Sequence, residues 1–165
     1  KSGGGVVLDL GIVMLDLILW MMGFPPVTRV SATMYGHKTK SVEDTCVATV
    51  KMKPDSVLTL EVSWSLLSAQ DYFYCNLFGT EGSALINPLR IHKQLHGSLV
   101  NLTPASSDSP NGLYRKSYEN ELRHFIGALR GLHPVVSTGE EAMERMKVVE
   151  AIYRSSQKGK EVQLG

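Results

Sequence analysis

The sequence predicts an α+β fold in which an open, mainly antiparallel sheet is covered on one face by helices. Apolar residues recur with helical spacing near both ends of the chain and alternate with polar ones between Val27 and Thr103. Alternation of this kind is typical of half-buried antiparallel strands. The chain has 165 residues, of which 43% are hydrophobic, so we expect a single domain over residues 1–165 with a sizeable core.

The first element is an apolar run from Val6 to Met22, close to the length of a membrane span. Asp9 and Asp16 lie inside it, and each carboxylate costs about 2.5–3.5 kcal/mol near a bilayer centre. No small-residue cleavage site follows the run, which argues against a signal peptide. The run therefore predicts a buried helix that Gly23 and the following prolines end.

Two carboxylates share one face of this predicted helix, because Asp9, Val13, Asp16 and Trp20 have the spacing of a single stripe. A buried carboxylate is costly unless it is hydrogen-bonded or paired. Two interpretations stay open. Either Asp9 caps the helix start and Asp16 pairs with a basic group, or the stripe faces a polar cleft.

The middle of the chain predicts a series of strands joined by short turns. Alternation marks Val30–Met34, Cys46–Met52 and Leu58–Leu66, and further strands are expected over Tyr72–Phe78, Ser83–Ile86, Leu89–Gln94 and Ser98–Leu102. The turns lie at Lys53–Ser56 and Gly79–Gly82. The second face of the sheet mixes Ser, Thr and Glu with aromatic residues, and we expect it to be a partner surface rather than a solvated one.

The end of the chain returns to helical spacing after a loop from Ala105 to Gly112. A first helix carries a stripe of Leu122, Phe125, Ile126 and Leu129 and is expected to end at Gly131. Thr138 and Glu141 fit a capping box for a second helix. That helix is expected to bury Ala142, Met146, Val149 and Tyr153 and to end before Gly159, with a short edge strand in Glu161–Leu164.

Composition and missing motifs exclude several function classes. The formal net charge is +1, which gives no electrostatic footprint for nucleic acid or an anionic membrane. Two cysteines, Cys46 and Cys75, form no disulfide framework and favour a reducing compartment, the cytoplasm. No dinucleotide-binding, phosphate-loop or zinc motif is present, so we expect neither a cofactor nor a metal in this chain.

Two further patterns in the sequence are only weak signals of a binding site. Gly3-Gly4-Gly5 precedes a helix and could cradle an anion, but no strand precedes it. His92 and His96 are four apart without a third ligand, whereas the remaining histidines stand alone as surface or packing residues: His37, His124 and His133.

The segment from Gly3 to Asp16 resembles the start of the C-terminal domain of the glucose–fructose oxidoreductase / inositol dehydrogenase (Gfo/Idh/MocA) oxidoreductases. The order of the remaining pieces fits as well: the Gly79-Thr80-Glu81-Gly82 turn, the stretch Glu121–Pro134, the helix ending Ala151–Gly159, and Val162. The resemblance covers essentially the whole chain.

The resemblance implies a domain like the C-terminal domain of glyceraldehyde-phosphate dehydrogenase, with an open sheet that makes the oligomer interface. It also implies an N-terminal Rossmann domain, absent here, which binds NAD or NADP and supplies a lysine. We therefore expect the substrate-binding and oligomerisation domain of an NAD(P)-dependent oxidoreductase for a sugar-like or polyol substrate. The chain alone should not turn over, and its start at Lys1 suggests that the Rossmann half lies upstream.

The family's helix motif is Asp-x-Gly-x-His-x-x-Asp, whose first Asp and His meet the substrate. Asp9, Gly11 and Asp16 match it, which makes Asp9 and Asp16 candidate catalytic residues, but Val13 stands where the histidine takes part in proton transfer. Three interpretations stay open: the missing lysine carries the proton transfer with Asp9, the substrate's chemistry needs no histidine base, or the chain is a non-catalytic binding or assembly module. Tyr72 and Tyr74 are substitute substrate-binding candidates, with packing on the sheet surface as the alternative.

Overall fold

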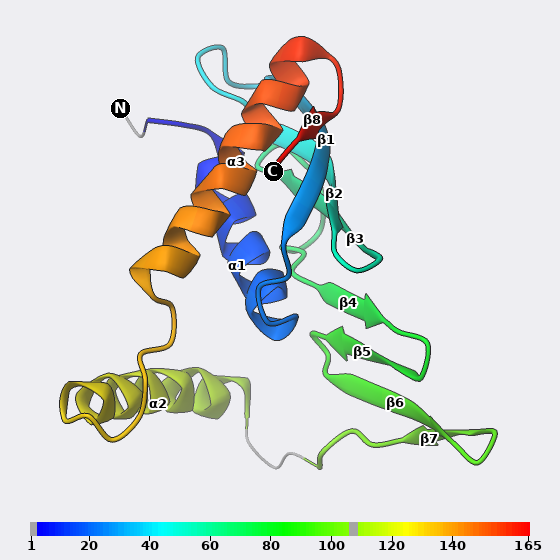
Figure 1. Cartoon of the computed structure of the whole chain (residues 1–165), viewed down its shortest axis with the longest axis vertical. Helices are drawn as coiled ribbons and strands as arrows, with labels where there is room; N and C mark the ends of the chain where they lie inside the picture. Colours follow the sequence, from blue (N-terminus) through cyan, green and yellow to red (C-terminus); the bar gives the residue numbers. More distant parts are fainter. Residues whose placement is uncertain (1–2, 106–108) are drawn as a thin grey trace. The chain divides into compact units, whose positions relative to one another are not determined.

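The computed structural model describes residues 3–105 and 109–165, which form helices and antiparallel strands (Figure 1). They divide into two compact units, one made of the residues up to Ser68 together with Ser137–Gly165, the other of Ala69–Val136. The predicted α+β class is confirmed. The strands, however, belong to two four-stranded sheets rather than one.

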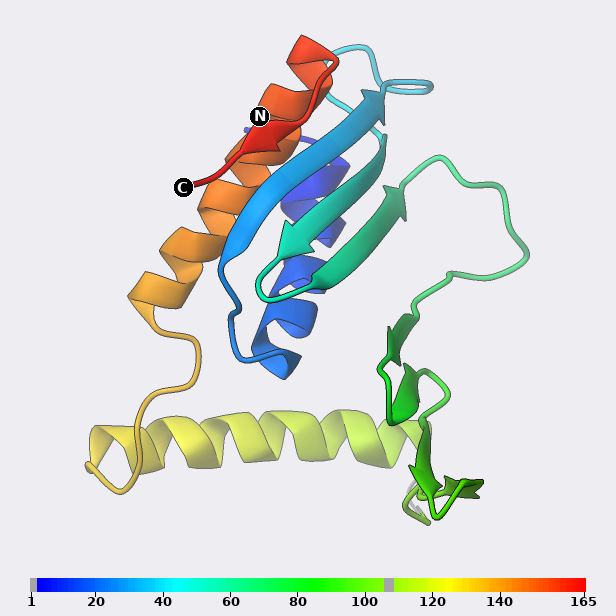
Figure 2. The same ribbon diagram turned by 45° about the vertical axis from the view of Figure 1, so that its right-hand side comes forward.

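The first unit packs two helices on one face of a twisted sheet (Figure 2). Its strands are antiparallel in the order β3-β2-β1-β8. The elements are η1 (Val7–Gly11), α1 (Ile12–Met21), β1 (Val27–Tyr35), β2 (Thr45–Met52), β3 (Ser56–Ser63), α3 (Gly139–Lys158) and β8 (Val162–Gln163).

Alternation along the strands sends every second side chain into the core of this unit. The buried strand residues pack against buried residues of the helices, each contributing about 1.5–3 kcal/mol by leaving water. The main contributors are Val30, Cys46, Val50, Leu60 and Val62 from the sheet and Leu15, Leu19, Val148, Val149 and Ile152 from the helices. Val149 is buried as predicted, but Met146 is exposed, because the inward face of α3 runs through Val148, Val149 and Ile152.

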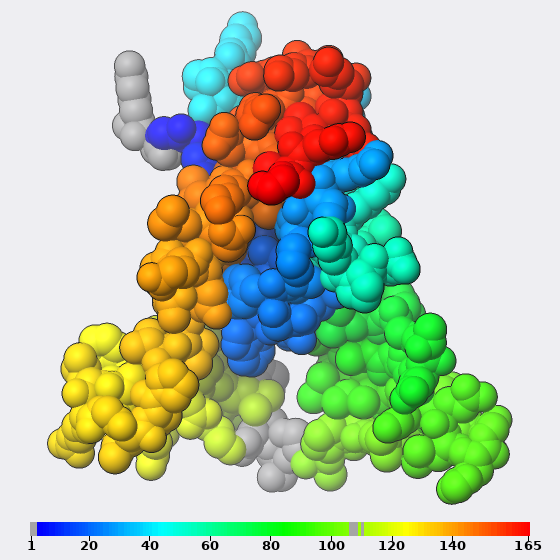
Figure 3. Space-filling view, in the orientation of Figure 1, coloured from blue at the N-terminus to red at the C-terminus, as the bar shows by residue number. Residues whose placement is uncertain are grey.

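Helix α3 begins and ends as the sequence predicts. The Thr138 hydroxyl accepts from the Glu141 N–H at 3.2 Å, while the Glu141 carboxylate accepts from the Thr138 N–H at 2.8 Å. At the other end Gly159 adopts φ 60°, the left-handed conformation that a glycine takes most easily. The predicted edge strand is confirmed as β8, which lies along β1 (Figure 3).

Strand β8 is so short that it pairs with β1 only at Arg29 and Val30. Farther along β1, hydroxyl groups of α3 take over as acceptors. The Ala32 N–H donates to Ser155 Oγ at 2.9 Å, and the Met34 N–H donates to Ser156 Oγ at 3.1 Å. Helix α3 therefore satisfies backbone donors that a longer strand would otherwise pair.

The second unit contains the strands β4 (Cys75–Phe78), β5 (Gly82–Ile86), β6 (Arg90–Leu95) and β7 (Ser98–Asn101), followed by α2 (Pro110–Leu129). The strands pair antiparallel in the order β4-β5-β6-β7. A Cβ at Gly82 would overlap the His92 carbonyl oxygen, which explains the glycine that closes the predicted turn. Helix α2 forms as predicted, but the side chains of its apolar stripe are exposed: Leu122, Phe125, Ile126 and Leu129.

The predicted boundaries at the end of β3 and at the start of α2 are wrong. Strand β3 ends at Ser63, so Trp64 and Leu66 are exposed instead of lying in the core. The loop predicted over Ala105–Gly112 is shorter, because α2 already starts at Pro110 with the Ser109 hydroxyl as its N-cap. Residues 106–108 of that loop lie outside the described residues.

The lengths and hydropathies of the helices test whether the apolar run could cross a membrane. Within residues 3–105 and 109–165, no helix is both long enough and apolar enough to span a bilayer.

Candidate functional site

The predicted stripe lies on the side of the first helix that the core leaves uncovered. Asp9, Val13 and Trp20 are exposed, with Val13 at 59%, while Leu15 and Leu19 are buried. Asp9 belongs to η1, a π-helical turn in which the Ile12 N–H donates to the carbonyl of Val7, five residues back. Such π turns inside helices are frequent at functional sites.

Trp64 holds the Asp9 carboxylate. Its indole Nε1–H donates to Asp9 Oδ2 at 3.0 Å across 55 residues of sequence. The Trp64 backbone is fixed in turn, because its N–H donates to the carbonyl of Asp44 at 2.8 Å. Since β3 has ended one residue earlier, the ring of Trp64 is free of the sheet and is 41% exposed.

The buried Asp44 carboxylate holds together the backbone segments next to Trp64. Its side chain is 1% exposed and accepts from the N–H groups of Lys38 at 2.6 Å and Thr39 at 3.1 Å. Its other carboxylate oxygen accepts from the hydroxyls of Thr45 and Ser65 at 3.1 and 3.3 Å. Burial raises the pKa of Asp44, but the hydrogen bonds from the backbone outweigh it and hold this pKa well below its usual range.

Glu43, not Asp9, caps the start of the helix. The N–H groups of Gly5 and Val7 both donate to Glu43 Oε1 at 3.2 Å, and the Tyr153 hydroxyl donates to the same oxygen at 2.6 Å. Burial and the Glu43 carboxylate raise the pKa of Tyr153 well above its usual range. The interpretation of Asp9 as the cap is therefore wrong, and the chain's own carboxylate occupies the glycine-rich helix start.

Asp16 is held by an ion pair within the same unit. Arg145 Nη1 of α3 lies 2.6 Å from Asp16 Oδ1, and the Arg145 side chain is only 11% exposed. Arg145 Nη2 also donates to the Ser137 hydroxyl at 3.2 Å. The pairing of Asp16 with a basic group is thus confirmed, and this carboxylate ties α1 to the beginning of α3.

Tyr72 and Tyr74 belong to the second unit and do not lie on a strand, contrary to prediction. Strand β4 starts only at Cys75 because its partner β5 ends at Ile86, after which Pro88 has no N–H to donate. Instead, the Asn87 side chain donates to the Phe73 carbonyl at 2.8 Å. Both tyrosine side chains are exposed.

The histidines that were predicted to be surface or packing residues pack against other rings, although two of them lie together rather than alone. His124 and His133 stack with ring centroids 4.1 Å apart, and His37 stacks on Tyr35 at 5.5 Å. Among the described residues, no three His, Cys, Asp or Glu side chains gather as a metal site requires. Cys46 and Cys75 are both buried free thiols, and burial raises the pKa of Cys46 to about 11.

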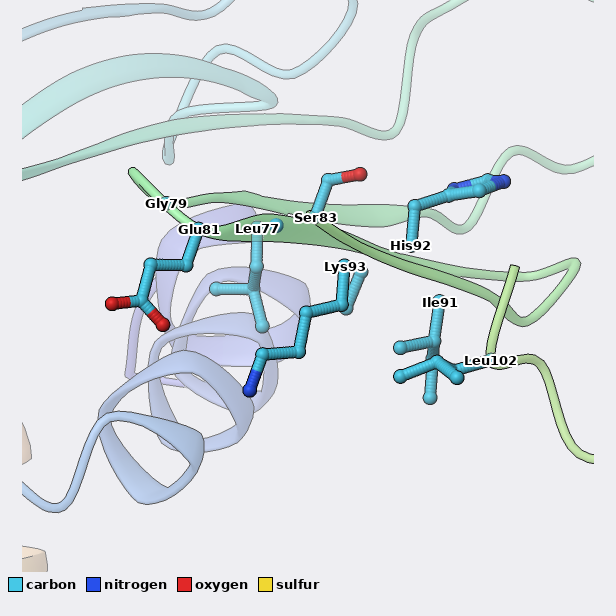
Figure 4. A pocket seen from close by; sticks show the side chains of 10 residues that line it. Leu77, Gly79, Glu81, Ser83, Ile91, His92, Lys93 and Leu102 are labelled. Carbon is cyan, nitrogen blue, oxygen red and sulfur yellow. The ribbon is translucent and has the colours of Figure 1, made fainter. Parts of the chain in front are cut away.

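A shallow hollow of about 330 Å³ lies on one face of the second sheet. Figure 4 shows that Leu77, Ile91 and Leu102 project to the same side, whereas Ser83 and His92 point to the other. The floor of the hollow is therefore mainly apolar, and the charged side chains of Glu81 and Lys93 also line it.

Three partners of the candidate site escaped the sequence prediction: Trp64, Glu43 and Arg145. Trp64 was assigned to the core because it continues the alternation of β3. Glu43 and Arg145 carry no motif, and they reach their partners across 36 and 129 residues of sequence. No local signal in the sequence links such distant residues.

Comparison with known proteins identifies a family for this chain. Residues 1–164 match the model of an oxidoreductase family, described as its C-terminal alpha/beta domain, in the Gfo/Idh/MocA group. D-glucoside 3-dehydrogenase of Escherichia coli (strain K12) is 27% identical over 179 residues, which cover 99% of this chain and 50% of that protein. This chain thus spans about half the length of that relative.

Solved structures share the fold. The aldose-aldose oxidoreductase from Caulobacter crescentus, complexed with glycerol, has a TM-score of 0.76 at 19% identity, covering 98% of this chain and 48% of its own. An oxidoreductase from Agrobacterium radiobacter in complex with NAD⁺, L-tartaric acid and magnesium has a TM-score of 0.75 at 18% identity, covering 96% and 48%. The match over residues 1–164 shows that this chain belongs to the Gfo/Idh/MocA oxidoreductase family, as its C-terminal domain.

Proposed function

We propose that this chain is the substrate-binding and oligomerisation domain of a cytoplasmic NAD(P)-dependent oxidoreductase that acts on a sugar-like or polyol substrate. The observation that carries the proposal is the Asp9 carboxylate, exposed on the helix and oriented by Trp64. A carboxylate accepts several hydrogen bonds, so with the indole on Oδ2 it keeps acceptor capacity for a substrate hydroxyl. The name of the D-glucoside 3-dehydrogenase relative supports the same substrate class.

The dinucleotide would be held outside this chain. The N–H groups of Gly5 and Val7 already donate to Glu43, so the glycine-rich helix start does not fit a pyrophosphate. We assign the cofactor to a Rossmann domain, which fits a chain that spans about half of its relative and a structural neighbour that binds NAD⁺. When bound there, the cofactor would take up hydride, while residues of this chain bind and orient the alcohol.

Because Val13 stands at the position of the family's histidine, another group must take the proton of the substrate hydroxyl. Alcohol oxidation needs a base near the hydroxyl, and the Val13 side chain neither accepts nor donates a proton. We therefore assign proton transfer to the lysine of the Rossmann domain, with Asp9 holding the hydroxyl. A substrate whose chemistry needs no histidine base would leave the role of Asp9 unchanged.

The first test is ligand binding by the chain itself. We expect a methyl glucoside or sorbitol to shift amide signals near Asp9 in ¹H–¹⁵N spectra, with binding weakened about tenfold or more in Asp9→Asn. Asp55→Asn, which changes an exposed carboxylate in the β2–β3 turn, is the matched control. Titration with NADH should produce no tight, stoichiometric complex. Such a complex, or equal losses in both variants, would contradict the proposal.

Oligomerisation is assigned to the outward face of the first sheet. This face mixes hydroxyl-bearing and apolar side chains across three neighbouring strands, a composition suited to a partner surface. It is formed by Ser31, Thr33 and Tyr35 of β1, Val47 and Thr49 of β2, and Val57, Thr59 and Glu61 of β3.

We expect light scattering of the chain to give a dimer or a larger assembly. Val47→Glu places a charge in the middle of this face and should shift the assembly to the monomer, because burying an unpaired charge between two chains is costly. A strictly monomeric wild-type chain at high concentration would count against this assignment.

The alternative is a non-catalytic binding or assembly module. Its support is that Val13, at the position of the family's histidine, is exposed rather than buried as a core substitution would be. The coding sequence upstream discriminates between the two. A strand–turn–helix with a glycine fingerprint and a Glu-Lys-Pro motif supports the enzyme, and an unrelated domain supports the module.

A further inference from the structure

The neighbourhood of Asp9 contains a feature that a bare carboxylate site does not need. The Trp64 ring has its N–H edge turned to Asp9, while 41% of the residue remains exposed to solvent. A tryptophan serving only the core would be buried, and one serving only as a donor could be replaced by a smaller side chain. A large apolar ring beside a carboxylate suits a ligand that has an apolar face for the ring and a hydroxyl for the carboxylate.

We propose that Trp64 is a specificity residue that selects a cyclic sugar over an acyclic polyol, and at the same time a positioning residue for Asp9. This inference rests on the proposed function and narrows its substrate class. The indole contributes through two different parts of its structure, its N–H and its ring face.

The ring face selects for the shape of the ligand. An aromatic ring carries negative charge on its face, which attracts C–H bonds bearing partial positive charge. A pyranose with equatorial hydroxyls presents a rigid patch of axial C–H bonds, with hydroxyls at its rim. An acyclic polyol has no such fixed face and loses more conformational freedom when it is flattened against a ring.

The N–H edge fixes the carboxylate that would meet the rim hydroxyl. Hydrogen bonds fix the backbone at Trp64 and at the next residue. The backbone N–H of Trp64 donates to the Asp44 carbonyl, and the Ser65 N–H donates to the Ser63 hydroxyl at 3.0 Å. The Ser65 hydroxyl also donates to Asp44 Oδ1. The indole is therefore presented by a hydrogen-bonded segment, so that its ring and the Asp9 carboxylate keep one relative placement.

The experiment uses the whole chain with Trp20→Phe as background, which leaves Trp64 as the one tryptophan of the sequence. Methyl β-glucoside and sorbitol are titrated in parallel, with the backbone amide signals of ¹H–¹⁵N spectra as the readout for every variant and Trp64 fluorescence as a second readout where Trp64 is present. We expect the glucoside to bind more tightly than sorbitol and to change the Trp64 fluorescence. Trp64→Leu removes both the ring and the N–H, so it should weaken the binding of both ligands, and the glucoside should lose about tenfold more affinity than sorbitol.

Trp64→Phe separates the two roles, because it keeps a ring but has no N–H. It should retain selectivity for the glucoside while losing affinity for both ligands. In the chain that keeps Trp64, the glucoside should shift the indole N–H signal, a response to ligand that a purely structural Trp64 would not show. Circular dichroism of each variant confirms that it is folded.

The outcomes are distinguishable. If both ligands bind the wild-type chain equally, and Trp64→Leu affects them equally or not at all, the ring-selection inference is overturned while the proposed function stands. If neither ligand binds the wild-type chain, the proposed function falls and this inference falls with it.

Discussion

Replacing Glu43 with alanine is expected to lower the free energy of unfolding by about 3–5 kcal/mol. One oxygen of this side chain accepts three hydrogen bonds, from the N–H groups of Gly5 and Val7 and from the Tyr153 hydroxyl. Removing the acceptor leaves two backbone donors and a half-buried hydroxyl without a partner, and each costs about 1–3 kcal/mol. The loss appears as a shift of the urea midpoint at constant m-value.

Two further variants show whether the cap is the cause. Tyr153→Phe removes only one of the three bonds and should cost about 1–2 kcal/mol. In Gly5→Ala, the new Cβ would overlap the Glu43 carbonyl oxygen and cost about 1–3 kcal/mol. Gly139→Ala is the control, because a Cβ there meets nothing and alanine favours the helix. A Glu43→Ala chain as stable as Tyr153→Phe would contradict the three-bond account.

The second large effect concerns acid stability and Asp44. Because hydrogen bonds hold the pKa of Asp44 below its usual value, the folded state favours the ionised carboxylate. Its stabilisation is complete above the unfolded value, about 3.9, and is lost as the pH falls from there through the lower folded pKa. The wild-type chain should therefore lose stability steeply below about pH 4.

Asp44→Asn isolates this contribution. At neutral pH the variant should be much less stable than the wild type, because an amide cannot replace a carboxylate that accepts from several donors at once. As the pH falls, the two stabilities should converge in urea titrations. Glu161→Gln is the comparison, since the hydrogen bond from exposed Arg29 lowers the pKa of Glu161 as well, but its convergence should be smaller. Parallel curves for Asp44→Asn would contradict the assignment.

The helices and strands of the first unit were predictable because a pattern of neighbouring residues in the sequence indicates each of them. The alternation of Cys46–Met52, the Thr138–Glu141 capping box and the Gly159 end all lie within a few residues of sequence, and all are found in the structure. Strand ends were predicted less well. Trp64 continues the alternation of β3, and its N–H donates to the Asp44 carbonyl opposite it, yet the strand ends at Ser63 and Trp64 is exposed.

The candidate site was predictable only in part. The stripe spacing placed Asp9 and Val13 on one exposed side, and the pairing of Asp16 was foreseen without its partner. Which carboxylate caps the helix was not predictable, because Asp9 lies in the first turn while Glu43 comes from a loop. Spacing in the sequence favours Asp9 as the cap, whereas folding brings Glu43 to the helix start from a distant part of the chain.

The serine hydroxyls on α3 have a consequence for association through strand edges. An edge strand with unpaired N–H groups is a template for another chain. Ser155 and Ser156 occupy two such donors of β1 beyond β8, so this side of the sheet is closed to an incoming strand. The opposite end of the strand order is β3, which contains no proline. In the first sheet, the edge that α3 does not close is therefore β3, and gatekeeper substitutions for this sheet belong there.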